Sequence, residues 1–244
     1  MKKFKALLFD INGTVSDIHT AEEDDNVFRT TANFLRYHGV MISGGTLKNE
    51  YIELNRRQRR ESPEDFPEFD VSGIFLDLVR RFRQRDVADE KTVADCAATV
   101  FRAASLYYLE LYTGVREVLT MLKKIYRLGA VSDGQSLWAM PELQMVGLAD
   151  FFECITVSGD VGFRKPDPRI FNLTLEKMGI KSEEAVFIGN DMYRDIYGSG
   201  IAGIKNIFFH SNQGEQRFAG RDPDYVVYRF NEIPAAVKFL EQNC

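Results

Sequence analysis

The chain is poor in cysteine and has no long apolar run. Its 244 residues contain three cysteines, Cys96, Cys154 and Cys244, which are odd in number and far apart. This pattern argues against a disulfide framework and against a zinc site, and it fits a reducing compartment. No apolar run approaches the roughly 18 residues of a membrane span, and the apolar stretch after Met1-Lys2-Lys3 is too short for a signal peptide. We therefore expect a cytoplasmic protein with no membrane partner.

An excess of positive charge is also absent. Lysine and arginine number 31 against 36 aspartates and glutamates, so the formal net charge is −5. No basic field therefore argues for a nucleic-acid partner. The apolar fraction of 45% and the charged fraction of 27% are ordinary for a globular protein. The length suits one large domain or one domain with an insertion, and nothing in the composition sets the oligomeric state.

The first strong signal is the segment Phe4–Thr14. Its run Ala6–Phe9 is short, bulky and continuous, as expected of a strand buried on both faces of a parallel sheet. The run ends in the acid Asp10, and Gly13 must turn the chain shortly afterwards. Functional crevices of open α/β sheets lie at the carboxyl ends of the strands. The sequence therefore predicts a reactive position at Asp10, with an ordinary polar strand end as the alternative.

The following hundred residues have a helical pattern. Four apolar stripes recur at spacings of three, four and seven residues, which is typical of amphipathic helices. The stripes are Phe28-Ala32-Leu35 with Gly39 after it, Leu47-Tyr51-Leu54, Ile74-Phe75-Leu78-Val79-Phe82, and Val93-Ala97-Val100-Ala104-Leu111. Pro63 and Pro67 separate the second stripe from the third. We predict that residues 16–112 form an all-helical insert with its own small core and two hinge strands.

Strand and helix patterns alternate again from Thr113 onward. Thr113 is predicted to cap one helix, and Asp167 followed by Pro168 is predicted to begin another that stops at Gly179. Strands are predicted at Leu128–Val131, Cys154–Val157, Ala185–Ile188, Lys205–Phe209 and Tyr225–Tyr228, and further helices at Ala139–Val146, Met192–Gly200 and Ile233–Gln242. The sequence thus predicts an α/β core domain made of residues 1–15 and 113–244.

Polar residues stand where three predicted strands end, and one lysine lies in a loop before a helix. These residues are Asp10 with Asn12, Ser132, Asp191 with Asp195, and Lys165. Because the carboxyl ends of parallel strands converge on one edge, acids that meet there need a cation or a substrate to compensate them. Oxygen-only ligands favour Mg²⁺, which also binds phosphate oxygens. A carboxylate nucleophile, a metal ion and an anion clamp together indicate phosphoryl transfer through an aspartyl-phosphate.

Four segments resemble, in order and spacing, the motifs of the haloacid dehalogenase (HAD) superfamily of hydrolases. The segments are Phe9–Val15, Val131–Gly134, Arg164–Asp167 and Ile188–Asp195, within a match that covers about residues 1–15 and 113–210. The resemblance implies a three-layer, Rossmann-like (Rossmannoid) α/β core whose parallel sheet has the order 5-4-1-2-3. It also implies that the helical insert is a C1 cap, as in subfamily I, which closes over the site and helps to select the substrate.

The resemblance further implies roles in binding phosphate. Asp10 stands in the position of the nucleophile. The hydroxyl of Ser132 and the following backbone N–H, at Asp133, would bind the phosphoryl group, and Lys165 would neutralise the nucleophile and the phosphate. The implied partner is a small phosphorylated molecule.

The implied cofactor is Mg²⁺. Its expected ligands are the carboxylate of Asp10, the backbone carbonyl of Asn12 and a residue of the fourth motif. Asn190 stands where a metal-binding aspartate is most common and Asp191 comes next, so either could reach the metal. Asp195 is the supporting acid of this motif.

The chain departs from the family at Asn12. Phosphatases of the superfamily usually carry aspartate there, which protonates the leaving oxygen and later activates water. A carboxamide does not exchange a proton near neutral pH, and general acid–base help is worth roughly 10²–10⁴-fold in rate. Asn12-Gly13 is a deamidation-prone pair that could convert to aspartate, and an engineered replacement is another explanation.

The departure leaves several functions open. The sequence favours a Mg²⁺-dependent phosphatase that is slow or specialised. The alternatives are a pseudoenzyme that binds a phosphorylated ligand or partner and, ranked lower, a 2-haloacid dehalogenase, because those enzymes carry a large aromatic residue at the position of Asn12. The presence of Asp10 favours an enzyme, since a pure binding module could lose this carboxylate.

An arginine run in the helical insert is the last feature of note. It contains Arg56, Arg57, Arg59 and Arg60. The run could be an anion-attracting face of the cap, but a solvated helix face is the interpretation that we favour. The identity of the leaving group is not readable from the sequence, because it depends on side chains of the insert.

Overall fold

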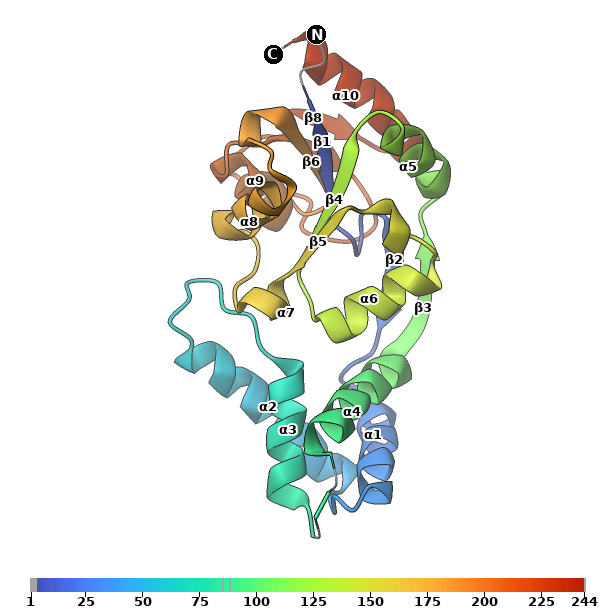
Figure 1. Ribbon diagram of the computed structural model, residues 1–244, viewed down its shortest axis with the longest axis vertical. Coiled ribbons are helices and arrows are strands. Elements are labelled where there is room, and N and C mark those ends of the chain that lie inside the picture. The colour runs from blue at the N-terminus through green and yellow to red at the C-terminus, as the bar shows by residue number, and fades with distance from the viewer. Residues whose placement is uncertain (1–3, 85, 88, 244) are drawn as a thin grey trace.

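The computed structural model describes residues 4–84, 86–87 and 89–243, which form two bodies (Figure 1). The first is an α/β body around a six-stranded sheet. The second consists of α1 (Asp25–Tyr37), α2 (Gly44–Glu61), α3 (Val71–Phe82) and α4 (Glu90–Ser105), and is called the four-helix body below. The antiparallel strands β2 (Ser16–Thr20) and β3 (Leu106–Leu111) join the two bodies.

The central sheet is entirely parallel. Its strands are β1 (Ala6–Phe9), β4 (Arg127–Ser132), β5 (Cys154–Val157), β6 (Ala185–Gly189), β7 (Lys205–Phe209) and β8 (Tyr225–Val227). The spatial order is β5-β4-β1-β6-β7-β8. Numbered along the chain, β1, β4, β5, β6 and β7 are core strands 1 to 5, so the sheet reads 5-4-1-2-3 from β7 to β5. This confirms the predicted fold, to which β8 adds an edge strand.

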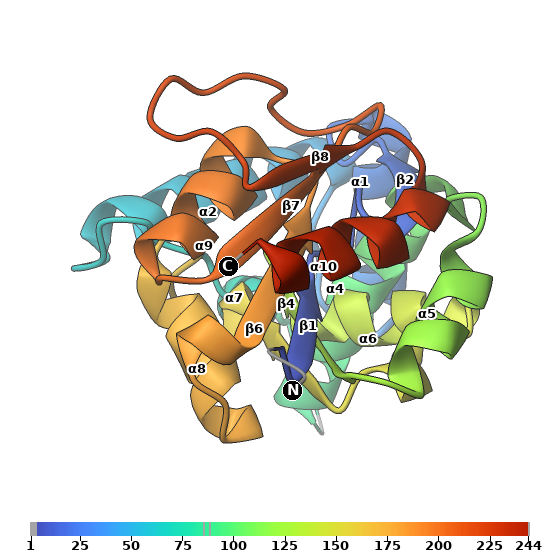
Figure 2. The same ribbon diagram turned by 90° about the horizontal axis from the view of Figure 1, so that it is seen from above.

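Helices cover both faces of the sheet, which gives three layers (Figure 2). The covering helices are α5 (Val115–Lys123) and α10 (Ile233–Gln242) on one face and α8 (Pro168–Met178) and α9 (Gly198–Ile201) on the other. The helices α6 (Ser136–Met145) and α7 (Ser158–Val161) lie between the sheet and the four-helix body. Because side chains alternate along β1, Leu7 and Phe9 join the apolar cluster beneath α5 and α10, whereas Ala6 and Leu8 join the cluster beneath α8. The central strand is therefore buried on both faces, as its uninterrupted apolar run predicts.

The four-helix body has an apolar core of its own. Buried residues from all four helices form one cluster, and Phe28, Phe75 and Phe101 are among its largest members. Trp138 also belongs to this cluster, although it lies on α6 of the α/β body. No helix in the described part of the chain has both the length and the apolar character needed to cross a bilayer.

Two local predictions at the junction of the bodies are wrong. Leu111 does not continue the fourth helix, because α4 ends at Ser105 and Leu106–Leu111 pairs with β2 as a strand. Thr113 does not cap α5, because Gly114 takes the N-cap position with φ of 86° and no side chain caps that helix. By contrast, Asp167 caps α8 as predicted, since its carboxylate accepts a hydrogen bond from the backbone N–H of Arg169.

Two predicted helices have different bounds in the structure. The predicted helix Ala139–Val146 is α6, which begins earlier, at Ser136, and contains Pro141. The predicted helix Met192–Gly200 divides into a π-helical turn, Met192–Tyr197, and the short α9. Neither difference moves a strand end, so the polar residues that follow the strands keep their predicted places.

Candidate active site

The polar residues that follow the strands converge at the edge of the sheet that faces the four-helix body. Asp10 follows β1, Ser132 ends β4, and Asn190 and Asp191 follow β6. All four are buried, as is Lys165 from the loop before α8. The structure thus brings together residues from segments more than a hundred positions apart.

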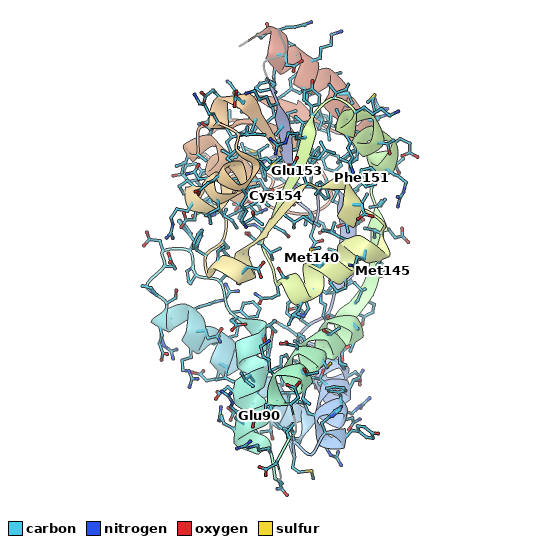
Figure 3. The ribbon with its side chains drawn as sticks, viewed as in Figure 1. Glu90, Met140, Met145, Phe151, Glu153 and Cys154 are labelled. Carbon is cyan, nitrogen blue, oxygen red and sulfur yellow. The ribbon has the colours of Figure 1, made fainter. Side chains whose placement is uncertain are left out.

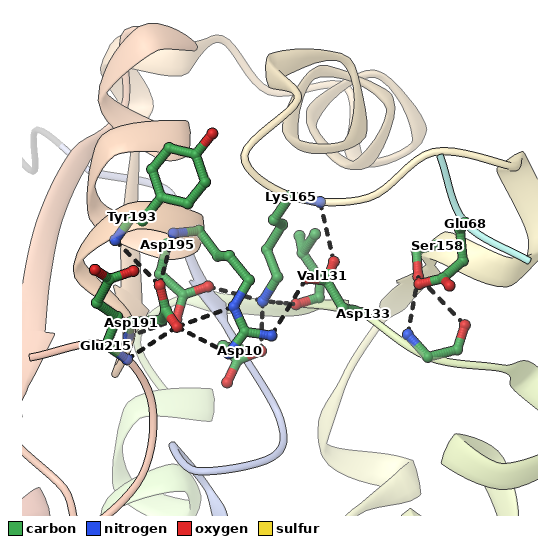
Figure 4. A network of polar contacts seen from close by, with 12 residues as sticks. Asp10, Glu68, Val131, Asp133, Ser158, Lys165, Asp191, Tyr193, Asp195 and Glu215 are labelled. Atoms are coloured by element: carbon green, nitrogen blue, oxygen red, sulfur yellow. Dashed lines mark hydrogen bonds and ion pairs between the residues drawn. The ribbon is translucent and has the colours of Figure 1, made fainter. Parts of the chain in front are cut away.

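Lys165 is the centre of this arrangement (Figure 4). Its Nζ lies 2.5 Å from Oδ1 of Asp10 and 2.7 Å from Oδ1 of Asp195, and it donates to the carbonyl of Val131 at 3.3 Å. The second oxygen of Asp195 accepts the backbone N–H groups of Asn190 and Asp191, both at 3.0 Å. Asp195 therefore positions both the lysine and the loop that follows β6.

Burial and neighbouring charges shift the pKa values of Lys165 and Asp195. Burial alone would lower the pKa of Lys165, but the carboxylates of Asp10 and Asp195 raise that pKa above its ordinary value. Burial raises the pKa of Asp195, and the Lys165 ammonium opposes this shift. Lys165 is therefore cationic at neutral pH, and one positive charge stands between two carboxylates. This excess of negative charge favours an additional cation.

The structure distinguishes Asn190 from Asp191. The hydroxyl of Thr14 lies 3.0 Å from Oδ2 of Asp10 and 3.0 Å from Oδ1 of Asn190, so these oxygens gather at one point. Asp191 faces another way. Its Oδ1 accepts the backbone N–H of Arg194 at 2.7 Å, and its Oδ2 lies 2.8 Å from the guanidinium of the same residue. The side chain of Asn190, not that of Asp191, thus shares the Thr14 hydroxyl with Asp10.

The donor set fits a hard divalent cation. Asp10 and Asn190 supply two converging side-chain oxygens, and Mg²⁺ completes such a set with water and phosphate oxygens. Across the described ranges, no group of three or more His, Cys, Asp or Glu side chains could hold a metal ion. An Mg²⁺ site here would therefore depend on an amide oxygen, and on backbone or water oxygens, as well as on one carboxylate.

Asn12 is held by a neighbouring hydroxyl. Its Oδ1 accepts a hydrogen bond from Oγ of Ser16 at 3.0 Å. The amide nitrogen is the remaining polar atom of this side chain, and it can only donate. Asp133, in turn, uses Oδ1 to accept the backbone N–H of Lys165 at 3.0 Å, while its Oδ2 is buried without a hydrogen bond in the described structure. The Asp133 side chain thus supports the loop of Lys165.

A cavity of about 410 Å³ separates this centre from the four-helix body. Asn12 and Ser132 line it on one side. The cavity is also lined by residues that were not predicted as site residues, namely Glu22, Glu68, Arg102, Trp138 and Glu142. These five residues are scattered over helices and loops, and no motif marks them. Of the arginine run, only Arg59 lines this cavity.

The two bodies contact each other around the same cavity, near α6, which Met140 and Met145 mark in Figure 3. Arg102 of α4 pairs with Glu142 of α6 at 2.6 Å. The indole N–H of Trp138 donates to the carbonyl of Ala98 at 3.0 Å. On the other flank, Oγ of Ser158 donates to Glu68 at 2.9 Å. Residues of both bodies therefore border the cavity.

The chain is similar in sequence to a family of hydrolases and to several phosphatases. A family model described as haloacid dehalogenase-like hydrolase matches residues 4–203. The glyceraldehyde 3-phosphate phosphatase of Pyrococcus furiosus is 30% identical over 249 residues, which cover 99% of this chain and 95% of that protein. The N-acylneuraminate-9-phosphatase of Rattus norvegicus is 24% identical and matches 63% of this chain and 62% of its own.

Solved structures share the fold at lower identity. A 2-haloacid dehalogenase from Pseudomonas syringae has a TM-score of 0.69 at 21% identity, covering 97% of this chain and 99% of that one. A HAD phosphatase from Thermococcus onnurineus has a TM-score of 0.59 at 23% identity, covering 96% and 98%. A hydrolase from Bacillus subtilis bound to magnesium has a TM-score of 0.56 at 20% identity, covering 97% and 100%.

Proposed function

We propose that this chain, which belongs to the haloacid dehalogenase-like hydrolases, is a Mg²⁺-dependent phosphatase that acts on a small phosphorylated molecule. The observation that carries the proposal is the buried Lys165 ammonium, 2.5 Å from Asp10 beside a cavity lined by Ser132. The names of the glyceraldehyde 3-phosphate phosphatases among its relatives support the same class of reaction.

In the proposed mechanism a carboxylate oxygen of Asp10 attacks phosphorus and forms an aspartyl-phosphate, and the substrate oxygen leaves. Lys165 and the hydroxyl of Ser132 stabilise the charge on the transferring group. Water then attacks phosphorus, which releases phosphate and restores Asp10. Asp195 acts through Lys165, whose ammonium it holds at 2.7 Å.

Magnesium would be held by Asp10, by Asn190 and by the backbone carbonyl of Asn12. When bound, the ion would supply Lewis-acid stabilisation of the phosphoryl oxygens. The oxygens of Asp10 and Asn190 both lie 3.0 Å from Thr14, which supports Asn190 as the ligand from the fourth motif.

Asn12 makes the proposed enzyme specialised. Its side chain can donate a hydrogen bond from nitrogen but cannot transfer a proton at neutral pH. Substrates with good leaving groups need little proton transfer, so they would be hydrolysed faster than alkyl phosphates. The 2-haloacid dehalogenase alternative has less support, because its solved relative is 21% identical and indicates the fold alone.

We assign residues 16–112 as a cap domain and residues 1–15 with 113–244 as the core domain. The separate apolar core of the four-helix body and the narrow β2–β3 connection support this division. The cap side chains that line the cavity would exclude bulk water when the site is closed. We also place the enzyme in the cytoplasm, where the unpaired Cys96 and Cys154 would remain reduced.

The test is the hydrolysis of 4-nitrophenyl phosphate with and without Mg²⁺ by the parent, Asp10→Asn and Asn12→Asp. We expect Mg²⁺-dependent turnover that Asp10→Asn abolishes. Asn12→Asp should accelerate hydrolysis of an alkyl phosphate by roughly 10²–10⁴-fold, because it restores a group that can exchange a proton. Mass spectrometry of the peptide containing Asn12 in the active parent excludes deamidation as the source of activity.

A binding protein without turnover is the second candidate, and Asn12 is the observation that favours it. That candidate is supported if neither the parent nor Asn12→Asp hydrolyses the substrates while the parent still binds a phosphorylated ligand. This result would overturn the proposed phosphatase activity. Activity that persists in Asp10→Asn would instead overturn the proposed nucleophile.

A further inference from the structure

The charges that line the cavity are unevenly paired. Four arginines line it: Arg59, Arg102, Arg164 and Arg194. Arg59 lies 3.1 Å from Glu68, Arg102 lies 2.6 Å from Glu142, and Arg194 lies 2.8 Å from Asp191. Three of the four guanidinium groups are therefore paired with carboxylates.

Arg164 is the exception. Its side chain is partly buried, yet it makes no hydrogen bond or ion pair with any residue of the described chain. Its backbone is fixed, because its N–H donates to the carbonyl of Phe66 at 2.9 Å and its neighbour is Lys165. A partly buried guanidinium without a carboxylate loses hydration and gains no partner. Its five donors remain available to a ligand.

A second positive charge lies close to Arg164. Burial lowers the pKa of Arg59, and the charge of Arg164 lowers it further, against the opposing effect of Glu68. The carboxylate of Glu68 cannot serve both arginines well, since it also accepts from Ser158 at 2.9 Å and from the N–H of Phe69 at 3.0 Å. The cavity lining as a whole carries as many carboxylates as arginines, namely Glu22, Glu68, Asp133 and Glu142. Arg164 is therefore distinguished by its lack of a direct partner and not by an excess of positive charge.

We propose that Arg164, assisted by Arg59, binds a second anionic group on the substrate. This group is a carboxylate or a second phosphate on the part of the molecule that leaves, and guanidinium recognises either by paired hydrogen bonds. The inference rests on the proposed phosphatase activity and narrows its substrate class. It favours phosphate esters with a second acidic group over esters of uncharged alcohols or aldehydes.

The test compares matched aryl phosphates. The substrates are phenyl phosphate, 4-carboxyphenyl phosphate and 1,4-phenylene bisphosphate, and the proteins are the parent, Arg164→Gln, Arg164→Lys and Arg59→Gln. Arg57→Gln is the control, because Arg57 is an exposed neighbour on α2 that pairs with Asp77 at 3.6 Å and does not line the cavity. The measured quantity is kcat/KM. For 4-carboxyphenyl phosphate and for 1,4-phenylene bisphosphate it is divided by the kcat/KM of phenyl phosphate.

We expect the parent to favour at least one substrate with a second acidic group by about 10–100-fold. Arg164→Gln should bring this ratio near one, Arg164→Lys should keep part of the preference, and Arg57→Gln should keep all of it. Comparing the carboxylate with the second phosphate identifies which anion is preferred. A parent ratio near one, or an unchanged ratio in Arg164→Gln, overturns the inference.

Failure of the proposed activity is separable from failure of this inference. If the parent hydrolyses none of the three compounds, titration calorimetry of the parent with phenyl phosphate and 4-carboxyphenyl phosphate gives the same comparison as a ratio of Kd values. The anion site is supported if the parent binds 4-carboxyphenyl phosphate more tightly than phenyl phosphate and Arg164→Gln loses this difference. Equal binding overturns it.

Discussion

The buried centre at Lys165 and the contact zone at Trp138 differ in where their parts originate. Around Lys165, two carboxylates that follow β1 and β6 hold one ammonium at 2.5 and 2.7 Å within a single body. Around Trp138, an α6 side chain enters the apolar core of the four-helix body and donates to Ala98 of α4 at 3.0 Å. The first region fixes charge inside one body, and the second joins two bodies by apolar burial.

The position of the reactive groups and their access to solvent are therefore controlled by different parts of the molecule. Parallel strands place Asp10 and the loop after β6 without help from the four-helix body. The cavity above them is flanked by contacts such as Arg102–Glu142 and Ser158–Glu68, in which each body supplies one partner. Changes in the first region should therefore impair chemistry and stability together. Changes in the second should affect the joining of the bodies more than the chemistry.

Replacement of the central cation should have the largest effect. Lys165→Met leaves Asp10 and Asp195 buried without the ammonium between them, and removing one partner of a buried ion pair costs about 3–5 kcal/mol. We expect the free energy of unfolding, measured with urea, to fall by this amount. We also expect the variant to lose phosphatase turnover. Lys177→Met on the exposed face of α8 is the matched control and should change neither. If the free energy of unfolding of Lys165→Met falls by less than about 1 kcal/mol, the ammonium does not stabilise the fold by neutralising Asp10 and Asp195.

The Lys165 centre could be predicted from the sequence, and the Trp138 zone could not. The apolar run Ala6–Phe9 marks the end of a strand in the local sequence, and the carboxyl ends of parallel strands meet at one edge of the sheet, so the place of Asp10 could be predicted. Trp138 lies on α6 in a sequence without a clear apolar stripe, and its partner Ala98 is 40 residues away. Which face of α6 meets α4 depends on how the two bodies pack, and local spacing does not encode that.

Errors at the junction have the same origin. The apolar spacing of the fourth stripe extends to Leu111, but pairing with β2 overrides it and makes Leu106–Leu111 a strand. In the same way, the choice between Asn190 and Asp191 depended on which side chain the turn after β6 uses as its own cap. The structure assigns that task to Asp191, which accepts the backbone N–H of Tyr193 and of Arg194.

Truncation of Trp138 tests the second region and should have an intermediate effect. Trp138→Ala removes a buried indole and its hydrogen bond, which should lower the free energy of unfolding by at most about 3–5 kcal/mol. The loss is smaller if neighbouring side chains move into the cavity. Trp138→Phe keeps most of the ring contact and should cost about 1 kcal/mol. Urea unfolding followed by far-UV circular dichroism gives the free energy of unfolding of both variants.

The activity of the same variants separates the two regions further. Turnover of 4-nitrophenyl phosphate should fall less in Trp138→Ala than in Lys165→Met, because the indole hydrogen-bonds to Ala98 and stacks on Phe101 and Arg102 of the four-helix body. Trp138 is also the single tryptophan of the chain, so the fluorescence of the parent reports directly on this zone. Equal loss of turnover in the two variants would show that the zones are not separable.

The smallest expected effect concerns Glu68, whose side chain is 4% exposed. Burial raises its pKa, although Phe69, Ser158 and Arg59 each oppose that shift. The folded protein therefore holds the Glu68 proton to a higher pH than the unfolded chain does. This group's contribution to stability is complete below its ordinary pKa of 4.5 and declines as pH rises through the raised folded value.

Glu68→Gln should remove that decline, because glutamine does not titrate. We expect the free energy of unfolding of the variant to fall less than that of the parent as the pH rises above the ordinary pKa of 4.5. Glu61→Gln, at an exposed position of α2, should leave the pH dependence unchanged. A parent and a Glu68→Gln variant with parallel pH profiles would mean that Arg59 and Ser158 fully offset burial. The Glu68 contact would then join the bodies with the same strength at every pH.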